Sequence, residues 1–235
     1  MKQLAALARG VPVCAAIFFV FSCASDGPVR KYPKMVADMD PVSVGTIEAQ
    51  FSRMFSSRLD KNEIEVIFYP RLNTVALQFR YEYTTYRQFW DEEGRRQFTA
   101  ALNNYKKGFE ERSLIEKYSQ TRGIYGRVKG QAEWEAFRYA KTHTSSPAIE
   151  LGYRFWGESP FFSTLMRSAR AEDDSADGAR FESQQISMYF TRTQAGELEK
   201  IFDQAYLLSF IKQKDIPTPS EPAAADAYRE FEGES

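Results

Sequence analysis

The sequence predicts an α+β protein: a meandering antiparallel β-sheet of about six or seven strands, covered on one face by two or three helices. Several stretches alternate apolar and polar residues with a period of two, and two others repeat with a period near 3.6. The connections between most predicted strands are too short for βαβ units. With 235 residues, of which 43% are hydrophobic, the chain can bury a substantial core.

The first element is an apolar run behind a basic N-terminus. No residue from Gly10 to Ser25 is charged, and Lys2 and Arg9 precede the run. A helix needs about 20 apolar residues to cross the hydrocarbon of a bilayer, and this run is shorter. Its layout is typical of an export signal. Residues 1–22 are therefore predicted to be a signal peptide.

The end of the apolar run reads Val20-Phe21-Ser22-Cys23. This segment resembles the lipobox of bacterial lipoproteins, in which an aliphatic residue, a second residue and a small residue precede an invariant cysteine. Phe21 departs from the pattern, because that place usually holds a small or β-branched residue. The resemblance implies that Cys23 receives a diacylglyceryl thioether and becomes the acylated first residue of the mature protein. An ordinary secretory signal, an uncleaved anchor and a core cysteine remain alternatives.

The resemblance also implies a location. A lipidated Cys23 would hold the protein on a membrane of the bacterial cell envelope, with the domain outside the cytoplasm. The chain's other cysteine, Cys14, lies in the segment that would be removed, which leaves the mature chain without an internal thiol. Residues 23–42 contain three prolines and little apolar periodicity, and they are predicted to be a tether. A single domain is expected over residues 43–214 and a disordered tail over residues 215–235, which are rich in Pro, Ala and acidic residues.

The domain is expected to begin with a short helix and two strands. Helical spacing is present at Ile47, Phe51, Met54, Phe55 and Leu59. The period then changes to two, first over residues 63–68 and again over residues 74–83. Both stretches alternate apolar and polar residues, which predicts two antiparallel strands with one face in water.

A long helix, five strands and a final helix are expected to follow. Thr85 and Gln88 have the spacing of a capping box for a helix that continues to about Lys117. Its apolar face comprises Trp90, Phe98, Ala101, Leu102, Tyr105 and Phe109. The five strands are predicted over residues 123–129, 133–140, 148–156, 161–168 and 181–190. The final helix is expected to begin near Thr193.

No motif for catalysis or metal binding emerges from the sequence. His143 is the only histidine, and its neighbours from Thr142 to Pro147 have the composition of a turn, which predicts an exposed loop histidine. Zinc sites need clustered Cys and His, which are missing. The acidic residues Glu172, Asp173, Asp174 and Asp177 lack the spacing of a calcium loop. The sequence therefore predicts no metal, no cofactor and no enzymatic activity.

The aromatic content suggests where a ligand could bind. The chain has 19 Phe, 13 Tyr and 3 Trp, most of which should lie in the core. If some of them line a space between sheet and helix, they would form a pocket for an apolar ligand. The candidate pocket residues are Trp134, Phe137, Tyr139, Tyr153, Phe155 and Trp156.

These observations favour a membrane-anchored lipoprotein with a noncatalytic binding or structural role in the envelope. Basic and acidic residues nearly cancel, at 31 against 32, so a nucleic acid is not an expected partner. Two alternatives stay open. The first is a carrier of a lipid or small apolar ligand, which would need an aromatic cavity. The second is a carboxylate-dependent hydrolase, because two carboxylates can converge in space from distant positions in the chain.

Overall fold

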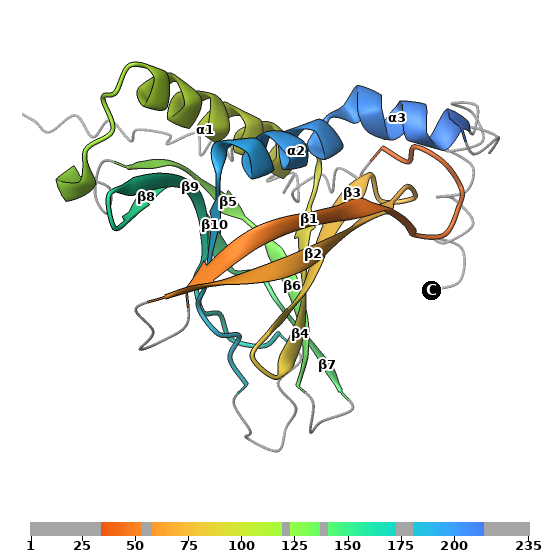
Figure 1. Cartoon of the computed structure of the whole chain (residues 1–235). Coiled ribbons are helices and arrows are strands. Elements are labelled where there is room, and N and C mark those ends of the chain that lie inside the picture. The colour runs from red at the N-terminus through yellow and green to blue at the C-terminus, as the bar shows by residue number, and fades with distance from the viewer. Residues whose placement is uncertain (1–33, 53–57, 119–122, 137–140, 173–180, 214–235) are drawn as a thin grey trace, which may run out of the picture. The chain divides into compact units, whose positions relative to one another are not determined.

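The computed structural model describes residues 34–52, 58–118, 123–136, 141–172 and 181–213. They form an antiparallel sheet with three α-helices, which confirms the predicted α+β class. Within these residues the sheet has ten strands, so the expected six or seven were too few. The sheet curls into a half-barrel with the helices along one side (Figure 1). The predicted signal peptide, Cys23 and the predicted tail lie outside the described residues.

The strands are β1 (Val42–Ser52), β2 (Leu59–Tyr69), β3 (Thr74–Tyr81), β4 (Thr84–Trp90), β5 (Ile124–Lys129), β6 (Gln131–Ala136), β7 (Thr142–Ser145), β8 (Ala148–Trp156), β9 (Ser159–Met166) and β10 (Ile186–Phe190). The helices are α1 (Glu92–Glu110), the 3-10 helix η1 (Glu116–Tyr118), α2 (Arg192–Phe202) and α3 (Gln204–Gln213). The order across the sheet is β5-β8-β9-β10-β1-β2-β3-β4-β6-β7. Among the described residues, none of the helices combines the length and the hydropathy that a membrane crossing requires.

Strand β1 occupies residues for which a helix was expected. Residues four apart lie on one face of a helix and also on one face of a strand, so Ile47 and Phe51 fit either element. Ala49 distinguishes a strand from a helix. It lies midway between Ile47 and Phe51 and is buried as they are, which the period of two along a strand requires. The register of β1 against β2 shifts between Ser43 and Gly45, which marks a bulge. The expected helix is therefore wrong over residues 47–52.

The first long helix begins later and ends earlier than predicted. Thr85 and Gln88 lie inside β4, where they pair with Arg80 and Leu77 of β3. The actual N-cap is Asp91, whose carboxylate accepts a hydrogen bond of 2.7 Å from the backbone N–H of Gly94. Helix α1 ends at Glu110 instead of about Lys117. The predicted capping box was therefore wrong, and Trp90 of the predicted apolar face belongs to β4, whereas Phe98, Ala101, Leu102 and Tyr105 are buried in α1 as expected.

Strand β7 forms where a turn was expected, and it belongs to one long bent hairpin. Only Gly130 separates β5 from β6, and only Ser146 and Pro147 separate β7 from β8. Strands β5 and β8 pair at one end of the sheet order, whereas β6 and β7 pair at the other. At the bend, the N–H of Gly130 donates to the carbonyl of Pro147 at 2.9 Å. This hairpin therefore links the two ends of the curled sheet.

Aromatic rings fill the space between the helices and the sheet. Phe98 of α1 meets Phe162 of β9 at 5.1 Å and Phe202 of α2 at 5.0 Å between ring centroids, both in edge-on geometry. Trp90 at the end of β4 packs edge-on against Phe98 at 5.8 Å. All four side chains are buried. These contacts hold α1 and α2 against the inner face of the sheet.

The packed unit includes residues before position 43, where the domain was expected to begin. Val36 and Ala37 are buried, and the N–H of Val36 donates to the carbonyl of Pro70 at 2.9 Å. Arg71 binds the carboxylates of Asp38 at 2.6 Å and Asp40 at 3.1 Å. The segment that leads into β1 therefore lies against the turn between β2 and β3.

A buried arginine connects this turn to the helices. Arg95 of α1 is 2% exposed, and burial lowers the pKa of its guanidinium. It donates to both oxygens of Asn73 in the β2–β3 turn, at 2.8 and 3.1 Å. It also donates to the carbonyl of Phe202 at 3.2 Å and to the side chain of Gln204 at 2.6 Å. Arg95 thereby joins the β2–β3 turn to the junction of α2 and α3.

Candidate functional site

The structure distributes the predicted pocket residues over separate places. Trp134 is buried in β6 and lies 5.5 Å from the ring of His143. Tyr153 is buried on the inner face of β8, where its hydroxyl donates to the carbonyl of Ile115 at 3.2 Å. Phe155 and Trp156 are half-buried at the end of β8. Phe137 and Tyr139 lie outside the described residues. Of the described candidates, Phe155 and Trp156 line the same hollow.

That hollow is an outer-face groove of about 870 Å³ over β8, β9, β10 and η1. Its position follows from strand alternation. Phe162 and Phe190 point into the packed interior, so their neighbours Ser163 and Tyr189 point to the opposite face of the sheet. Both Ser163 and Tyr189 line the groove. We refer to this hollow as the outer-face groove.

Small side chains form the floor of the outer-face groove. Ser163 of β9 lies between Gly152 of β8 and Tyr189 of β10 in the register of the sheet. Ser187 of β10 lies opposite Leu165 of β9 and also lines the groove. Serine side chains fill little volume above the sheet, whereas the residues at either end of the groove are large. The hollow therefore depends on the small residues of β9 and β10.

One end of the outer-face groove is aromatic. Trp156 and Tyr189 meet edge-on, with 5.9 Å between ring centroids and 66° between ring planes. Tyr189 also contacts Phe161 at 6.3 Å and 86°. Because three rings support one another, Trp156 and Tyr189 are held in place without a ligand. Such rings can stack on a flat apolar surface of a bound molecule.

The charged residues of the groove are mainly cationic. Its charged residues are Lys117, Arg154, Arg167 and Glu116. Arg154 makes no salt bridge with any residue that the structure describes. An arginine in this setting can bind a carboxylate or phosphate through two hydrogen bonds. The charge of the groove therefore favours an anionic ligand.

A buried carboxylate positions Arg167. Glu150 of β8 is 6% exposed, although it alternates with the inward-facing Ile149 and Leu151. It accepts from Arg167 at 3.0 Å and from Arg127 at 3.2 Å. Arg167 also donates to the side chain of Gln185 at 3.2 Å. The Arg167 guanidinium is thus fixed by two partners at the edge of the groove.

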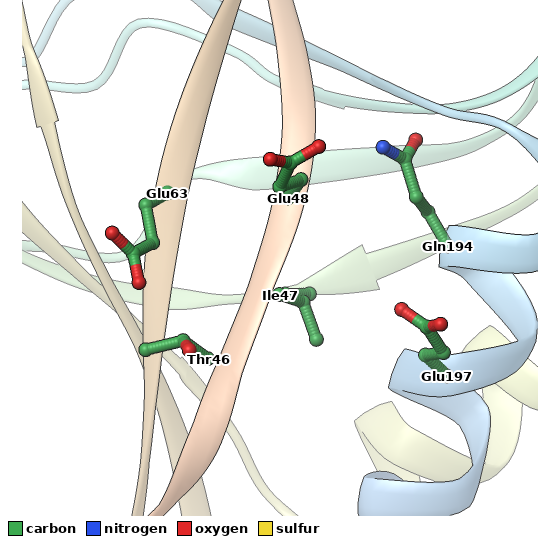
Figure 2. A pocket seen from close by; sticks show the side chains of 6 residues that line it. All are labelled: Thr46, Ile47, Glu48, Glu63, Gln194 and Glu197. Carbon is green, nitrogen blue, oxygen red and sulfur yellow. The ribbon is translucent and has the colours of Figure 1, made fainter.

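A second hollow, of about 490 Å³, contains three carboxylates (Figure 2). Glu48 of β1 and Glu63 of β2 are cross-strand partners, and Glu197 extends from α2. Figure 2 shows the carboxylate of Glu63 turned away from Glu48. Glu48 is exposed and pairs with Lys61 at 3.4 Å. The described residues include no group of three or more His, Cys, Asp or Glu that could hold a metal ion.

His143 is a buried residue, so the expected exposed loop histidine is wrong. It lies in β7 with 2% of its surface exposed. Its ring stacks on Phe181 at 4.4 Å and 26° between ring planes. Glu172, from the predicted acidic loop, accepts a hydrogen bond from the hydroxyl of Ser146 at 2.6 Å. The other three acidic residues of that loop lie outside the described residues.

Two predicted pocket residues, Phe155 and Trp156, line the groove, whereas Tyr189 and the charged residues were not among the candidates. Phe155 and Trp156 were candidates because of their residue type. Arg154 lies in β8, Lys117 in η1 and Arg167 just after β9, and each is an ordinary surface residue when considered alone. The signal that could have found Arg154 is its alternation with Tyr153 and Phe155 along β8.

Fold and groove together define a class: an α+β domain with a packed aromatic interior and a cationic, aromatic groove on the outside of its sheet. The chain belongs to the family described as "Uncharacterised Treponema protein", whose model matches residues 41–209, more than half of the sequence. The matched range extends from the start of the sheet into α3. No curated protein and no solved structure matches the chain.

Proposed function

We propose that this protein is a lipid-anchored, noncatalytic binding protein of the cell envelope, which engages an anionic ligand through the outer-face groove. The lipobox-like segment ending at Cys23 supports the anchor. The family to which the chain belongs is described from a bacterial genus, which agrees with a lipid signal of the bacterial type. The domain would face the space outside the cytoplasm, attached to a membrane through its N-terminal lipid.

One observation carries the binding role. The outer-face groove brings the cations Arg154 and Arg167 next to the supported rings of Trp156 and Tyr189. A ligand that fits both features has a carboxylate, sulfate or phosphate group beside a flat, weakly polar ring. The serine hydroxyls of the floor can satisfy further polar groups of such a molecule. An acidic oligosaccharide combines these properties.

The second candidate is a carrier of a lipid or small apolar ligand. Phe155, Trp156 and Tyr189 offer ring surface for such a molecule in the same groove. The packed rings between sheet and helices occupy the space where an interior ligand would lie. The two candidates differ in whether the ligand needs the charge of Arg154. A carboxylate-dependent hydrolase gains no support from the orientation of Glu63 relative to Glu48.

Metabolic labelling with a fatty-acid analogue tests the anchor. The wild-type protein should incorporate the label, and Cys23→Ser should not, because the thiol is the proposed attachment point. Incorporation into the Cys23→Ser variant at the wild-type level would refute lipidation at this residue.

Mass spectrometry of small molecules that copurify with residues 24–235 tests the groove. We expect an anionic molecule with the wild-type chain and with a Lys107→Glu control, since Lys107 is exposed on α1. Arg154→Glu should reduce its recovery about tenfold, as expected for the loss of about 1.4 kcal/mol of binding free energy. A neutral molecule lost only in Trp156→Ala would indicate the apolar carrier instead. Equal recovery from all variants would contradict both roles.

A further inference from the structure

The outer-face groove has an arginine at each of its two ends. Arg154 of β8 pairs with Phe161 of β9 at one end. At the other end, the N–H of Arg167 donates to the carbonyl of Ala148, the first residue of β8, at 2.9 Å. The guanidinium of Arg167 bonds Glu150, which lies four residues before Arg154 on the same face of β8. Four residues of an antiparallel strand span about 14 Å, so the groove holds two well-separated cationic groups. We call these places the Arg154 end and the Arg167 end.

The Arg167 end keeps a net positive charge although it contains a carboxylate. Glu150 accepts from Arg167 at 3.0 Å and from Arg127 of β5 at 3.2 Å. One carboxylate neutralises only one of the two guanidinium groups. The side chains of Arg167 and Arg127 are 47% and 67% exposed, and each guanidinium has N–H groups that do not bond Glu150. Glu150 is therefore a positioning residue, which holds a cationic group where an anionic part of a ligand can bind it.

Only the Arg154 end offers aromatic rings. Trp156 lies two residues beyond Arg154 on the same face of β8, and its ring meets that of Tyr189 at 5.9 Å. At the Arg167 end, the neighbouring side chain in the groove is Gln185, which accepts from Arg167 at 3.2 Å. A ligand with one anionic ring can therefore use a cation and an aromatic surface together only at the Arg154 end.

The space between the two ends is lined by small polar side chains. Ser163 lies two residues after Phe161 on the outer face of β9, and Ser187 of β10 lies farther toward the Arg167 end. Both hydroxyls can donate to and accept from the hydroxyl groups of a sugar. The other charged residues of the lining, Lys117 and Glu116, offset each other. The middle of the groove therefore suits neutral, hydroxyl-rich parts of a ligand that is long enough to touch both ends.

We propose that the outer-face groove binds an extended acidic oligosaccharide that contacts both ends at once. One anionic ring binds at the Arg154 end, on the rings of Trp156 and Tyr189, and a second anionic group binds Arg167. This inference rests on the proposed binding role of the groove. It goes further, because a ligand with a single anionic group would need the Arg154 end alone. Two contacts joined in one chain bind more tightly than either contact by itself.

The test compares galacturonate with its linear hexamer, both of which carry one carboxylate on each ring. Isothermal titration calorimetry on the full chain, purified in detergent, measures the two affinities. If the ligand used one end only, the hexamer would gain at most about sixfold, because it merely offers more equivalent units. Simultaneous contact with both ends should raise the affinity of the hexamer about a hundredfold above that of galacturonate.

Substitutions at the two ends should act differently on the two ligands. Arg167→Gln should weaken the hexamer about tenfold and leave galacturonate unchanged, since the single ring binds at the other end. Arg154→Gln should weaken both ligands. Lys107→Gln is the matched control, because Lys107 is exposed on α1, and it should change neither affinity. Circular dichroism confirms that each variant is folded, and the comparison of the two ligands on the wild-type chain requires no variant.

The possible results separate this inference from the proposed function. A gain of no more than about sixfold for the hexamer, with both ligands weakened by Arg154→Gln, would overturn the extended ligand and leave the anionic groove intact. Equal weakening of the hexamer by Arg167→Gln and Lys107→Gln would indicate attraction by overall charge and would overturn the inference. If neither galacturonate nor the hexamer binds the wild-type chain, the extended ligand and the anionic groove are both overturned.

Discussion

Arg95 donates hydrogen bonds to both oxygens of Asn73, to the backbone carbonyl at 2.8 Å and to the side-chain oxygen at 3.1 Å. Asn73 has a φ of 47°, a left-handed conformation that asparagine tolerates better than most residues. All the acceptors named for Arg95 are neutral oxygens. A buried charge is thus stabilised by carbonyl groups, and the same bonds satisfy carbonyls at a turn and at a helix junction.

Replacing Arg95 by methionine should destabilise the fold strongly. The variant leaves the carbonyls of Asn73 and Phe202 buried without their donor, which we expect to cost about 3 kcal/mol. Urea unfolding followed by circular dichroism measures this change. Arg96→Met is the matched control one residue along α1, because Arg96 is exposed and pairs only at the surface with Glu93. A free energy of unfolding that Arg95→Met leaves at the wild-type value would contradict the structural role of this arginine.

Gly152 of β8 lies so close to a neighbouring segment of backbone that a side chain at this position has no room. A Cβ atom at this position would lie 1.9 Å from the carbonyl oxygen of Gly123, which accepts a hydrogen bond from Tyr153. Gly152→Ala should therefore cost about 2–3 kcal/mol in the free energy of unfolding, because backbone must move. Gly126→Ala is the control, since a Cβ there meets no atom within 4 Å. If the two variants have the same thermal stability, the backbone at Gly123 can move at little cost and the prediction is wrong.

Stability should fall at alkaline pH. Burial raises the pKa of Tyr86 and that of Tyr105 to about 12, against 10.0 in an exposed tyrosine. The unfolded chain therefore releases these protons at lower pH than the folded chain. The contribution of the neutral hydroxyls is complete below pH 10 and is lost as the pH rises to about 12. Unfolding in urea at a series of pH values, with phenolate absorbance, measures the effect.

A Tyr86→Phe variant provides the control for this alkaline transition. It removes one of the two buried hydroxyls and should make the decline between pH 10 and about 12 shallower. A free energy of unfolding that stays constant across that range in the wild-type protein would contradict the prediction.

Glu150→Gln should loosen the charged end of the outer-face groove. The substitution removes the charge that Arg167 and Arg127 share, and charge-assisted hydrogen bonds of this kind contribute about 1.5–3 kcal/mol. We expect a loss of about 2 kcal/mol in denaturant unfolding. Glu48→Gln is the control, because the pair of Glu48 with Lys61 is exposed and should contribute less than about 1 kcal/mol. Similar losses in both variants would argue against a special role of Glu150.

The sequence was sufficient to predict the α+β class and those strands in which apolar and polar residues alternate clearly. Strands β2, β3, β8 and β9 were found because one face of each is apolar. Strand β1 was missed because residues four apart satisfy a helix and a strand equally. Strand β7 was missed because Thr, Ser and His are common in turns, and the segment is a strand through its pairing with β6, which its own sequence does not reveal.

The candidate site was predictable only in part, because it is assembled from distant positions. Trp156 and Phe155 could be named from their residue type. Arg167 could not, since its importance depends on Glu150, which is 17 residues away in sequence and buried only after β8 and β9 have paired. Local patterns report which face of a strand is apolar, but not which polar residues of neighbouring strands meet.

The bent hairpin that joins the two ends of the sheet has a consequence for how the domain can open. Strands β5 to β8 follow one another within residues 124–156, so the two rims of the curl are covalently continuous through a few bonds at Gly130 and Pro147. Peeling either rim away strains the other through this short bridge. The two rims should therefore open together, as one unit, rather than one after the other.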